Sequence, residues 1–476
     1  MDLLKEGPYL KDQENTNKMM KRLLLSLIPI ILFAIYKNGI YPYWEGSSSL
    51  GEAFRPLFLI LIASGTSILA ETLYVSLVLK KKKEDLKEYL KHSYALFPGL
   101  FLALISPYNT PYWLIIFGSI TATILGKMLF GGFGYNIFNP ALIGSLFMTS
   151  SYGALITSRG GYLNPLEIDT ITSSTPLMSV SKVNYLFNFS DISFKFGTLF
   201  DYFFGFIPGA LGETSKILIL IALIYLIITK VIKWRIPLLY LLTVFIMTFI
   251  IGFSNGMGFW YPLFHLLSGG LLFGAVFMAT DPVTSPITKK GQILFALSLG
   301  LLTVILRFLT SYPEGVLTAI LTMNMFVFIL DKIGVKGELN KKGFLSLLLI
   351  FFIIILGISF YIGNSLKNID VKEEITTITE IKKEGSLTKY YVSTKGFAGL
   401  IKAEVITRDN QIKEIKIISQ NESYWKKIES NDYLNTLIIN QDNINNVDAI
   451  SGATFTSESL KEIMVRVIKE EFKEVK

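Results

Sequence analysis

The chain has 476 residues, of which 51% are hydrophobic and 17% are charged, and its mean hydropathy is +0.49. This composition is typical of a membrane protein with many spans and excludes an ordinary soluble enzyme. The chain has no Cys and only two His residues, which excludes disulfides, Cys-ligated iron–sulfur clusters and bis-His haem. Any redox chemistry must therefore use an organic cofactor. The net charge of +8 does not indicate nucleic acid, and we expect no nucleic-acid partner, because in a membrane protein the positions of the charges report orientation.

The first apolar segment, residues 23–36, follows a basic polar stretch, and no small-residue cleavage pattern comes after it. We interpret it as a retained transmembrane helix and not as a cleaved signal. A bilayer core is about 30 Å thick, so a spanning helix needs roughly 20 apolar residues. The sequence predicts about eleven spans, of which the third and fifth are short, centred near residues 30, 68, 99, 119, 144, 222, 244, 271, 299, 322 and 353.

Basic loops alternate along the chain with nearly neutral ones such as residues 255–262 and 311–315. The positive-inside rule places the basic set and the N-terminus in the cytoplasm. Eleven crossings then put the C-terminus on the extracytoplasmic side, together with the loop after the fifth span. The basic segments are residues 80–91, 230–235, 289–290 and 332–342.

One carboxylate, Glu71, lies within the second span. An intramembrane charge costs roughly 2.5–3.5 kcal/mol on insertion scales, so Glu71 should face the bundle interior and have a partner. It is either a ligand in a cation pathway or a structural hydrogen-bond acceptor. Lys127 and Arg307 are close enough to span ends to snorkel, and we expect no role for them.

Residues 131–142 combine three glycines with Asn136, Asn139 and Pro140. This pattern predicts a broken helix entering the membrane, where irregular backbone is tolerated around a buried site or a cavity. The alternative is that both Asn residues only cap the interrupted helix. Asp281 precedes two prolines and marks either a second break that mirrors the first or a solvated helix N-cap in a cytoplasmic loop.

Two short segments match in the same register. Each begins with an Asp, continues with a stretch rich in hydroxyl residues and reaches a Thr six positions later: Asp169 leads to Thr175, and Asp448 leads to Thr454. A Thr in a loop of small residues can be esterified by a flavin phosphate. In the first segment the spacing alone leaves Thr170 and Thr172 as alternatives.

After about residue 363 the composition becomes polar and charged, which predicts a soluble domain of about 110 residues. Alternation of apolar and polar residues predicts strands over residues 389–393, 399–407 and 412–418. A helical pattern of apolar residues from 460 to 468 predicts an amphipathic helix, capped near Ser457. The fold class is therefore a polytopic α-helical membrane protein with a C-terminal α+β domain outside the cytoplasm.

Thr454 lies in a loop just before this predicted helix, after Ser451, Gly452 and Ala453. An anion there would meet free backbone N–H groups and the positive end of the helix dipole. The small residues let a bulky group approach the backbone. The alternative is an ordinary turn in which a neighbouring hydroxyl caps the helix.

The segment 451–457 resembles the flavinylation motif of FMN-binding domains, which occur in the G subunit of Rnf complexes and the C subunit of the sodium-pumping NADH:quinone reductase. The likeness covers about residues 343–476. It implies that a flavin transferase joins FMN through its phosphate to Thr454.

The membrane part resembles the D subunit of Rnf and the B subunit of the quinone reductase. Three blocks carry this likeness, residues 131–142, 172–177 and 279–286. They imply a second FMN ester on Thr175, although this chain has two Ser residues where the soluble motif has Gly-Ala. They also imply a non-covalent riboflavin held by Asn136 and Asn139, and inverted repeats with broken helices.

The chain thus resembles a fusion of the D and G subunits: a membrane domain (1–342), an anchor helix (343–363) and an FMN-binding domain (364–476). In this family, electron flow from ferredoxin to NAD⁺ is coupled to export of Na⁺ or H⁺ across the bacterial inner membrane. The resemblance implies an electron-transfer subunit whose partners carry the iron–sulfur and nicotinamide sites, and places Glu71 and Asp281 as candidates for the ion pathway. The alternatives are a flavin-based conduit to an extracytoplasmic acceptor and a redox-inactive channel or transporter.

Overall fold

A computed structural model of the chain describes residues 16–474 apart from several gaps. The gaps are residues 47, 159–174, 182–184, 188, 190–192, 194–195, 311–314, 369–375, 385–386, 396–399, 409–410, 421–424, 442–443, 445–446, 448–449 and 451–453. The chain forms two compact units, Met1–Asn368 and Ile369–Lys476. Each unit is described by itself.

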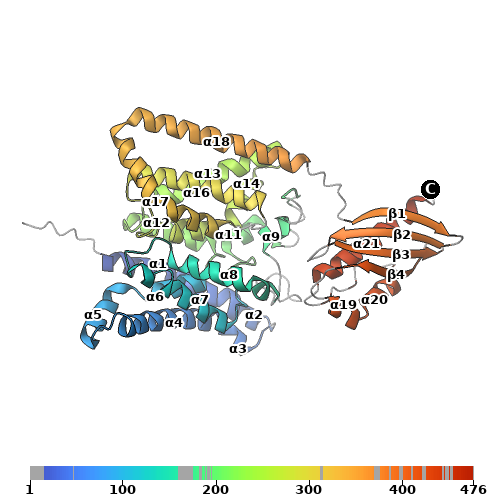
Figure 1. The fold of residues 1–476 in the computed structure, drawn as a ribbon, viewed down its shortest axis with the longest axis horizontal. Helices are drawn as coiled ribbons and strands as arrows, with labels where there is room; N and C mark the ends of the chain where they lie inside the picture. The colour runs from blue at the N-terminus through green and yellow to red at the C-terminus, as the bar shows by residue number, and fades with distance from the viewer. Residues whose placement is uncertain are drawn as a thin grey trace, which may run out of the picture. The chain divides into compact units, whose positions relative to one another are not determined.

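The first unit is helical, and its long apolar helices lie side by side (Figure 1). Its first half contains α1 (Thr16–Ile35), η1 (Tyr36–Ile40), α2 (Tyr41–Trp44), α3 (Leu50–Ala53), α4 (Arg55–Leu77), α5 (Lys83–Ser93), α6 (Leu96–Leu104), α7 (Tyr112–Ile124), η2 (Met128–Phe130) and α8 (Pro140–Ser158). Its second half contains α9 (Pro176–Ser181), α11 (Leu199–Phe204), α12 (Lys216–Ile228), α13 (Arg235–Ser254), α14 (Trp260–Leu267), α15 (Leu271–Phe273), η3 (Gly274–Met278), α16 (Lys289–Leu309), α17 (Val316–Leu339) and α18 (Lys341–Asn368).

Among the described residues, seven helices are long and apolar enough to cross a membrane, or eight if the bent pair formed by α14 and residues 271–278 is one span. The other three predicted segments correspond to shorter or interrupted helices. α6 has nine residues, α12 has 13, and α8 has non-helical dihedral angles at Tyr152. Nine residues rise only about 14 Å, so α6 cannot cross a bilayer core without its non-helical continuation. The count of eleven spans stays a prediction.

The two halves of this unit share one pattern of neighbours. α4 packs against α6 and α7, and α7 packs against α8; in the same order, α13 packs against α14 and α16, and α16 packs against α17. In both sets the second member is broken or short: α6 ends after nine residues, and the axis bends by 66° between α14 and residues 271–278. This correspondence supports an internal repeat.

The second unit is an antiparallel sheet in the order β1-β2-β3-β4, covered by helices (Figure 1). The strands are β1 (Thr376–Glu384), β2 (Leu387–Lys395), β3 (Leu400–Arg408) and β4 (Gln411–Ser419), and the helices are α19 (Trp425–Ser430), α20 (Tyr433–Ile439) and α21 (Thr454–Glu474). α21 packs on β1, β2 and β3. Its buried residues, which include Leu460, Ile463 and Val467, share a core with Tyr390 and Val405 of the sheet.

The three predicted strands agree with β2, β3 and β4. The predicted helix start is wrong, because α21 begins at Thr454 and not near Ser457. The Ser457 hydroxyl lies inside the first turn and accepts a hydrogen bond from the Ile450 backbone N–H at 3.1 Å. The loop before the helix is therefore tied back to the helix by Ser457.

Candidate functional site

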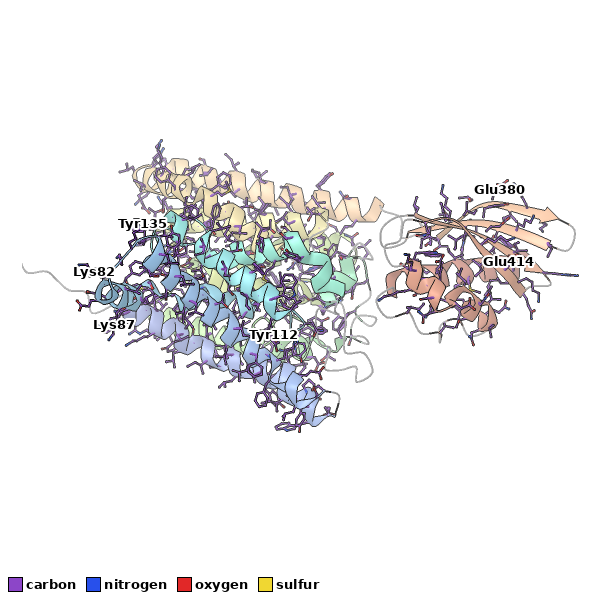
Figure 2. The ribbon with its side chains drawn as sticks, turned by 60° about the horizontal axis from the view of Figure 1, so that its bottom comes forward. Lys82, Lys87, Tyr112, Tyr135, Glu380 and Glu414 are labelled. Atoms are coloured by element: carbon purple, nitrogen blue, oxygen red, sulfur yellow. The ribbon has the colours of Figure 1, made fainter. Side chains whose placement is uncertain are left out.

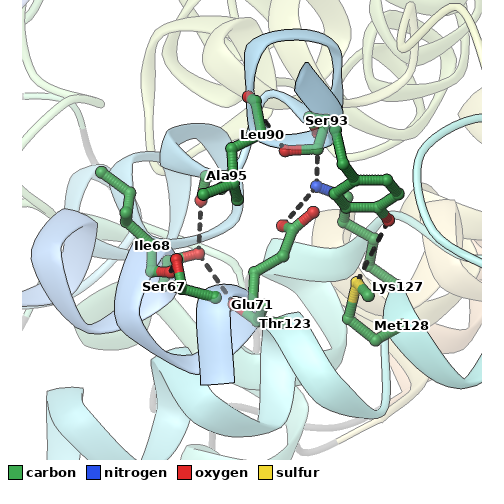
Figure 3. A network of polar contacts seen from close by, with 11 residues as sticks. Ser67, Ile68, Glu71, Leu90, Ser93, Ala95, Thr123, Lys127 and Met128 are labelled. Atoms are coloured by element: carbon green, nitrogen blue, oxygen red, sulfur yellow. Dashed lines mark hydrogen bonds and ion pairs between the residues drawn. The ribbon is translucent and has the colours of Figure 1, made fainter. Parts of the chain in front are cut away.

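The predicted intramembrane carboxylate, Glu71, is completely buried on α4 and has a partner. Its Oε2 lies 2.6 Å from the Lys127 Nζ, which also donates a hydrogen bond to the Ser93 carbonyl oxygen (Figure 3). The other oxygen, Oε1, has no hydrogen-bond partner among the described residues. Within the described part of the chain, the ion pair thus occupies only one of the two carboxylate oxygens.

The expectation that Lys127 and Arg307 snorkel is wrong. Lys127 is 2% exposed, and Arg307 is completely buried. The Arg307 guanidinium donates a 2.7 Å hydrogen bond to the His265 carbonyl oxygen. Both cations lie inside the helical unit, where a charge needs partners, and neither partner could be identified from sequence spacing.

A cavity brings together residues from both predicted helix breaks. Asn136 and Asn139, from the segment before α8, line it with Thr280 and Asp281, from the segment after η3, and Lys127 also lines it. Its aromatic lining residues are Tyr94, Phe97, Phe101, Phe133 and Phe277. A mostly apolar cavity with a few convergent polar groups is the usual form of a cofactor site.

The two asparagines have different local roles. The Asn139 Oδ1 accepts a hydrogen bond from the Ala141 backbone N–H at 3.1 Å, so Asn139 caps α8. Its own backbone N–H donates to Asn324 Oδ1 at 3.2 Å, which ties this break to α17. Asn136 instead donates to the Phe138 carbonyl oxygen at 3.1 Å and is not a cap. A capping role alone thus does not account for both residues.

Asp281 lies in the turn between η3 and α16. Its carboxylate accepts hydrogen bonds from Thr284 Oγ1 at 3.0 Å and from the Val283 N–H at 3.3 Å. Burial raises the pKa of Asp281 above its usual value, and the hydrogen bonds from Thr284 and Val283 oppose that shift. The N-cap of α16 is Thr288 and not Asp281. The bend of 66° also lies elsewhere, at residues 268–270, where the run Ser-Gly-Gly is a helix-breaking signal that was missed.

Thr175 is 1% exposed and immediately precedes α9. Its Oγ1 accepts a hydrogen bond from the Met178 N–H at 3.2 Å, and its carbonyl oxygen accepts one from the Ser179 N–H at 3.0 Å. Thr175 therefore caps α9, and its hydroxyl has a fixed position. Asp169, Thr170 and Thr172 lie outside the described residues.

Thr454 is the first residue of α21, a helix of 21 residues. Asp448, Ser451, Gly452 and Ala453 lie outside the described residues. The first backbone N–H groups of a helix have no partner within the helix and favour an anion.

Comparisons with known proteins match both units. Residues 3–339 match the NQR2, RnfD, RnfE family, and residues 396–469 match the FMN-binding domain. Among similar proteins, the D subunit of the proton-translocating ferredoxin:NAD(+) oxidoreductase complex of Clostridium ljungdahlii is 34% identical over 330 residues, which is 69% of this chain and 93% of the relative.

Two further relatives are also D subunits. That of the Na(+)-translocating ferredoxin:NAD(+) oxidoreductase complex of Acetobacterium woodii is 33% identical over 68% of this chain and 91% of its own. That of the ion-translocating oxidoreductase complex of Escherichia coli (strain K12) is 30% identical over 68% of this chain and 94% of its own. The chain therefore belongs to the NQR2, RnfD, RnfE family and carries, in addition, an FMN-binding domain.

Proposed function

We propose that this chain is the membrane electron-transfer subunit of an Rnf-type complex, and that it carries two FMN groups, on Thr175 and Thr454. The observation that carries the proposal is the joining, in one chain, of an RnfD-type membrane unit and an FMN-binding domain. Each contains the same Asp-to-Thr motif. The family assignment supports membrane electron transfer with ion translocation.

One structural feature beside each threonine supports a phosphate ester. The Thr175 oxygen is already an acceptor for the Met178 N–H, and an ester oxygen could keep that role. Because this side chain is buried, we expect a flavin transferase to act before the segment packs. At Thr454 the N-terminal turn of α21 supplies backbone N–H groups toward a phosphate.

A flavin supplies one- and two-electron transfer when bound, and the protein positions it and sets its surroundings. The chain has no Cys, so it provides no ligands of the usual kind for iron–sulfur clusters. We therefore propose that partner proteins of the complex carry the iron–sulfur and nicotinamide sites and exchange electrons with the flavins held here. The first two relatives named above belong to ferredoxin:NAD(+) oxidoreductase complexes, which supports this assignment.

We propose that a non-covalent riboflavin binds at the cavity beside Asn136 and Asn139, whose volume of about 70 Å³ requires the lining side chains to move apart when the flavin enters. Aromatic side chains line it, and the two Asn residues and Thr280 supply polar atoms for a flavin ring or a ribityl chain. Lys127 and Asp281 line the same cavity, and Lys127 binds Glu71. We propose that Glu71 and Asp281 belong to the cation pathway on this side of the membrane unit.

The orientation follows the positive-inside rule. Lys82 and Lys87 lie at one end of the helical unit together with Tyr135 (Figure 2). We propose that this end faces the cytoplasm, so that the cavity near Asn136 opens there. The flavin-bearing threonines then belong to the extracytoplasmic side.

In-gel flavin fluorescence of the denatured protein tests the proposal, because a phosphoester bond survives denaturation. Protein made with an active flavin transferase should fluoresce, and Thr175→Ala and Thr454→Ala should each weaken the band. The double variant should be dark. Thr170→Ala and Thr172→Ala are matched controls that should leave the signal unchanged. A dark wild-type band would overturn the proposal.

A further inference from the structure

A second group of buried charges surrounds the bend at residues 268–270 and includes none of the residues assigned above. Lys37, Glu213 and Lys216 are each at most 4% exposed. Lys37 lies on η1, Glu213 on the segment that precedes α12, and Lys216 is the first residue of α12. Charged side chains inside a membrane unit are costly and are by default functional.

Both ammonium groups are bound by backbone oxygens. Lys216 Nζ donates to the Gly269 carbonyl oxygen at 2.9 Å and also to the Glu213 carbonyl oxygen. Lys37 Nζ donates to the Ile207 carbonyl oxygen.

The bend explains why charges gather here. Ser268 has an extended backbone, and Gly269 has a φ of +64°, so α14 ends inside the unit and a new helical segment begins at Leu271. Lys216 lies at the negative C-terminal end of α14. The Glu213 carboxylate touches Gly270, at the positive N-terminal end of the next segment, so closely that a Cβ there would overlap it. Each half-helix dipole thus faces a charge of opposite sign.

The charges of Lys216 and Glu213 at the two helix ends do not explain why four other polar oxygens are buried nearby in the chain. Thr214 Oγ1, Ser215 Oγ and Ser268 Oγ are buried and have no hydrogen-bond partner among the described residues, and the same is true of Asn38 Oδ1, next to Lys37. Leaving a buried polar atom without a partner destabilises the fold. These oxygens belong to residues within two positions of Lys216, Gly269 or Lys37 in the chain. Together with the Glu213 carboxylate and the carbonyl oxygens that bind the Lys216 ammonium, they are the ligand types that bind a small monovalent cation. Unwound carbonyls and the C-terminal ends of half-helices bind such ions in broken-helix transporters.

We propose that the oxygens around the Lys216 ammonium form a binding site for a small monovalent cation, which that ammonium occupies in this conformation. This inference rests on the proposed cation translocation. It adds to that pathway a second cation-binding site, distinct from Glu71 and Asp281. A free cation and the Lys216 ammonium exclude each other, because the same carbonyl oxygens bind both. A movement of the bent span away from Lys216, which lies on α12, opens the site.

The test uses the purified full-length chain and equilibrium binding of radioactive Na⁺ in choline chloride. In Lys216→Met the tethered cation is gone, and Na⁺ should bind saturably, at least about tenfold (about 1.4 kcal/mol) more tightly than in the wild type. Adding Ser268→Ala to this variant should weaken binding again. Lys233→Met, which removes an exposed lysine just after α12, should behave as the wild type. Equal Na⁺ binding by the wild type, Lys216→Met and Lys233→Met would overturn the site.

If Lys216→Met does not fold in choline chloride, folding itself is the readout. A monodisperse protein should then be recovered in NaCl, and equal failure in both salts would overturn the proposal. In-gel flavin fluorescence on the same preparations separates the two hypotheses. A fluorescent chain that fails these Na⁺ tests contradicts only the cation site, whereas a dark wild-type chain contradicts the flavin assignment.

Discussion

The Glu71–Lys127 pair joins two charges inside the helical unit at a distance of 2.6 Å, with side-chain exposures of 0% and 3%. Removing one partner of such a pair leaves an uncompensated buried charge, which typically costs about 3–5 kcal/mol. Replacing both partners removes that penalty. The pair therefore contributes little net stability, and this favours a functional reason for its presence.

We predict that Glu71→Gln and Lys127→Met each destabilise the protein by about 3–5 kcal/mol. The double variant should be clearly more stable than either single variant, because no charge is then left alone. Thermal unfolding in detergent measures the effect. Glu338→Gln is a matched control, since the Lys290–Glu338 pair is 3.6 Å long with Glu338 53% exposed, and it should change stability by less than about 1 kcal/mol. Additive effects of Glu71→Gln and Lys127→Met would contradict this account.

The sequence predicted the burial of Glu71, because a carboxylate within an apolar span is costly when it faces lipid and therefore faces the interior of the helix bundle. It did not predict Lys127 as the partner. The two residues are 56 positions apart, and their contact depends on how α4 packs beside α7. In the same way, the pattern around Asn136 and Asn139 indicated a broken helix, but the cavity shared with Asp281 comes from tertiary packing.

At the scale of elements, close approach between helices depends on glycine. A Cβ on Gly99 of α6 would overlap the Ala63 carbonyl oxygen of α4 and press on the Ser67 side chain. This contact places α6 against α4, and Ser67 also binds Thr123 of α7 at 2.7 Å. The packing of α4, α6 and α7 around the Glu71–Lys127 pair therefore depends on the absence of a side chain at Gly99.

We predict that Gly99→Ala destabilises the protein by about 1–3 kcal/mol, because the extra methyl group forces the two backbones apart. Gly65→Ala, on α4, is the matched control: a Cβ there meets no atom within 4 Å, and Ala favours the helix by up to about 1 kcal/mol. Thermal unfolding compares the two variants. Equal stability of Gly99→Ala and Gly65→Ala would show that the α4–α6 contact is not close in solution.

The elements that the sequence predicted are those with a regular pattern. β2, β3 and β4 alternate apolar and polar residues, whereas β1 carries only Ile378 and Ile381 as apolar residues, three positions apart. A bulge between Ile378 and Glu380 explains that spacing. Because the bulge breaks the alternation of apolar and polar residues, the sequence pattern did not predict β1. The bend at residues 268–270 was missed, although its Ser-Gly-Gly run is a breaker signal, because the apolar residues on both sides together have the length of one continuous span.

At the scale of the whole molecule, sidedness decides whether the two threonines can serve one electron path. The chain has no Cys, so a single introduced Cys is an unambiguous label. Lys413, on β4, and Lys87, on α5, are both exposed and belong to the two units.

We predict that a membrane-impermeant maleimide labels Lys413→Cys in intact cells and labels Lys87→Cys only after the membrane is permeabilised. The positive-inside rule leads to this result, because Lys87 belongs to the basic segment that follows α4 and includes α5. Immunoblotting of the labelled chain provides the measurement. The reverse pattern would place the FMN-binding domain in the cytoplasm and contradict the orientation.

The most direct test of the central claim is the intact mass of the mature, full-length chain. The account predicts a mass that exceeds the value from the sequence by two FMN minus two water molecules, with one increment lost in Thr175→Ala, one in Thr454→Ala and both in the double variant. A wild-type chain, made with an active flavin transferase, whose mass matches the bare sequence would contradict it.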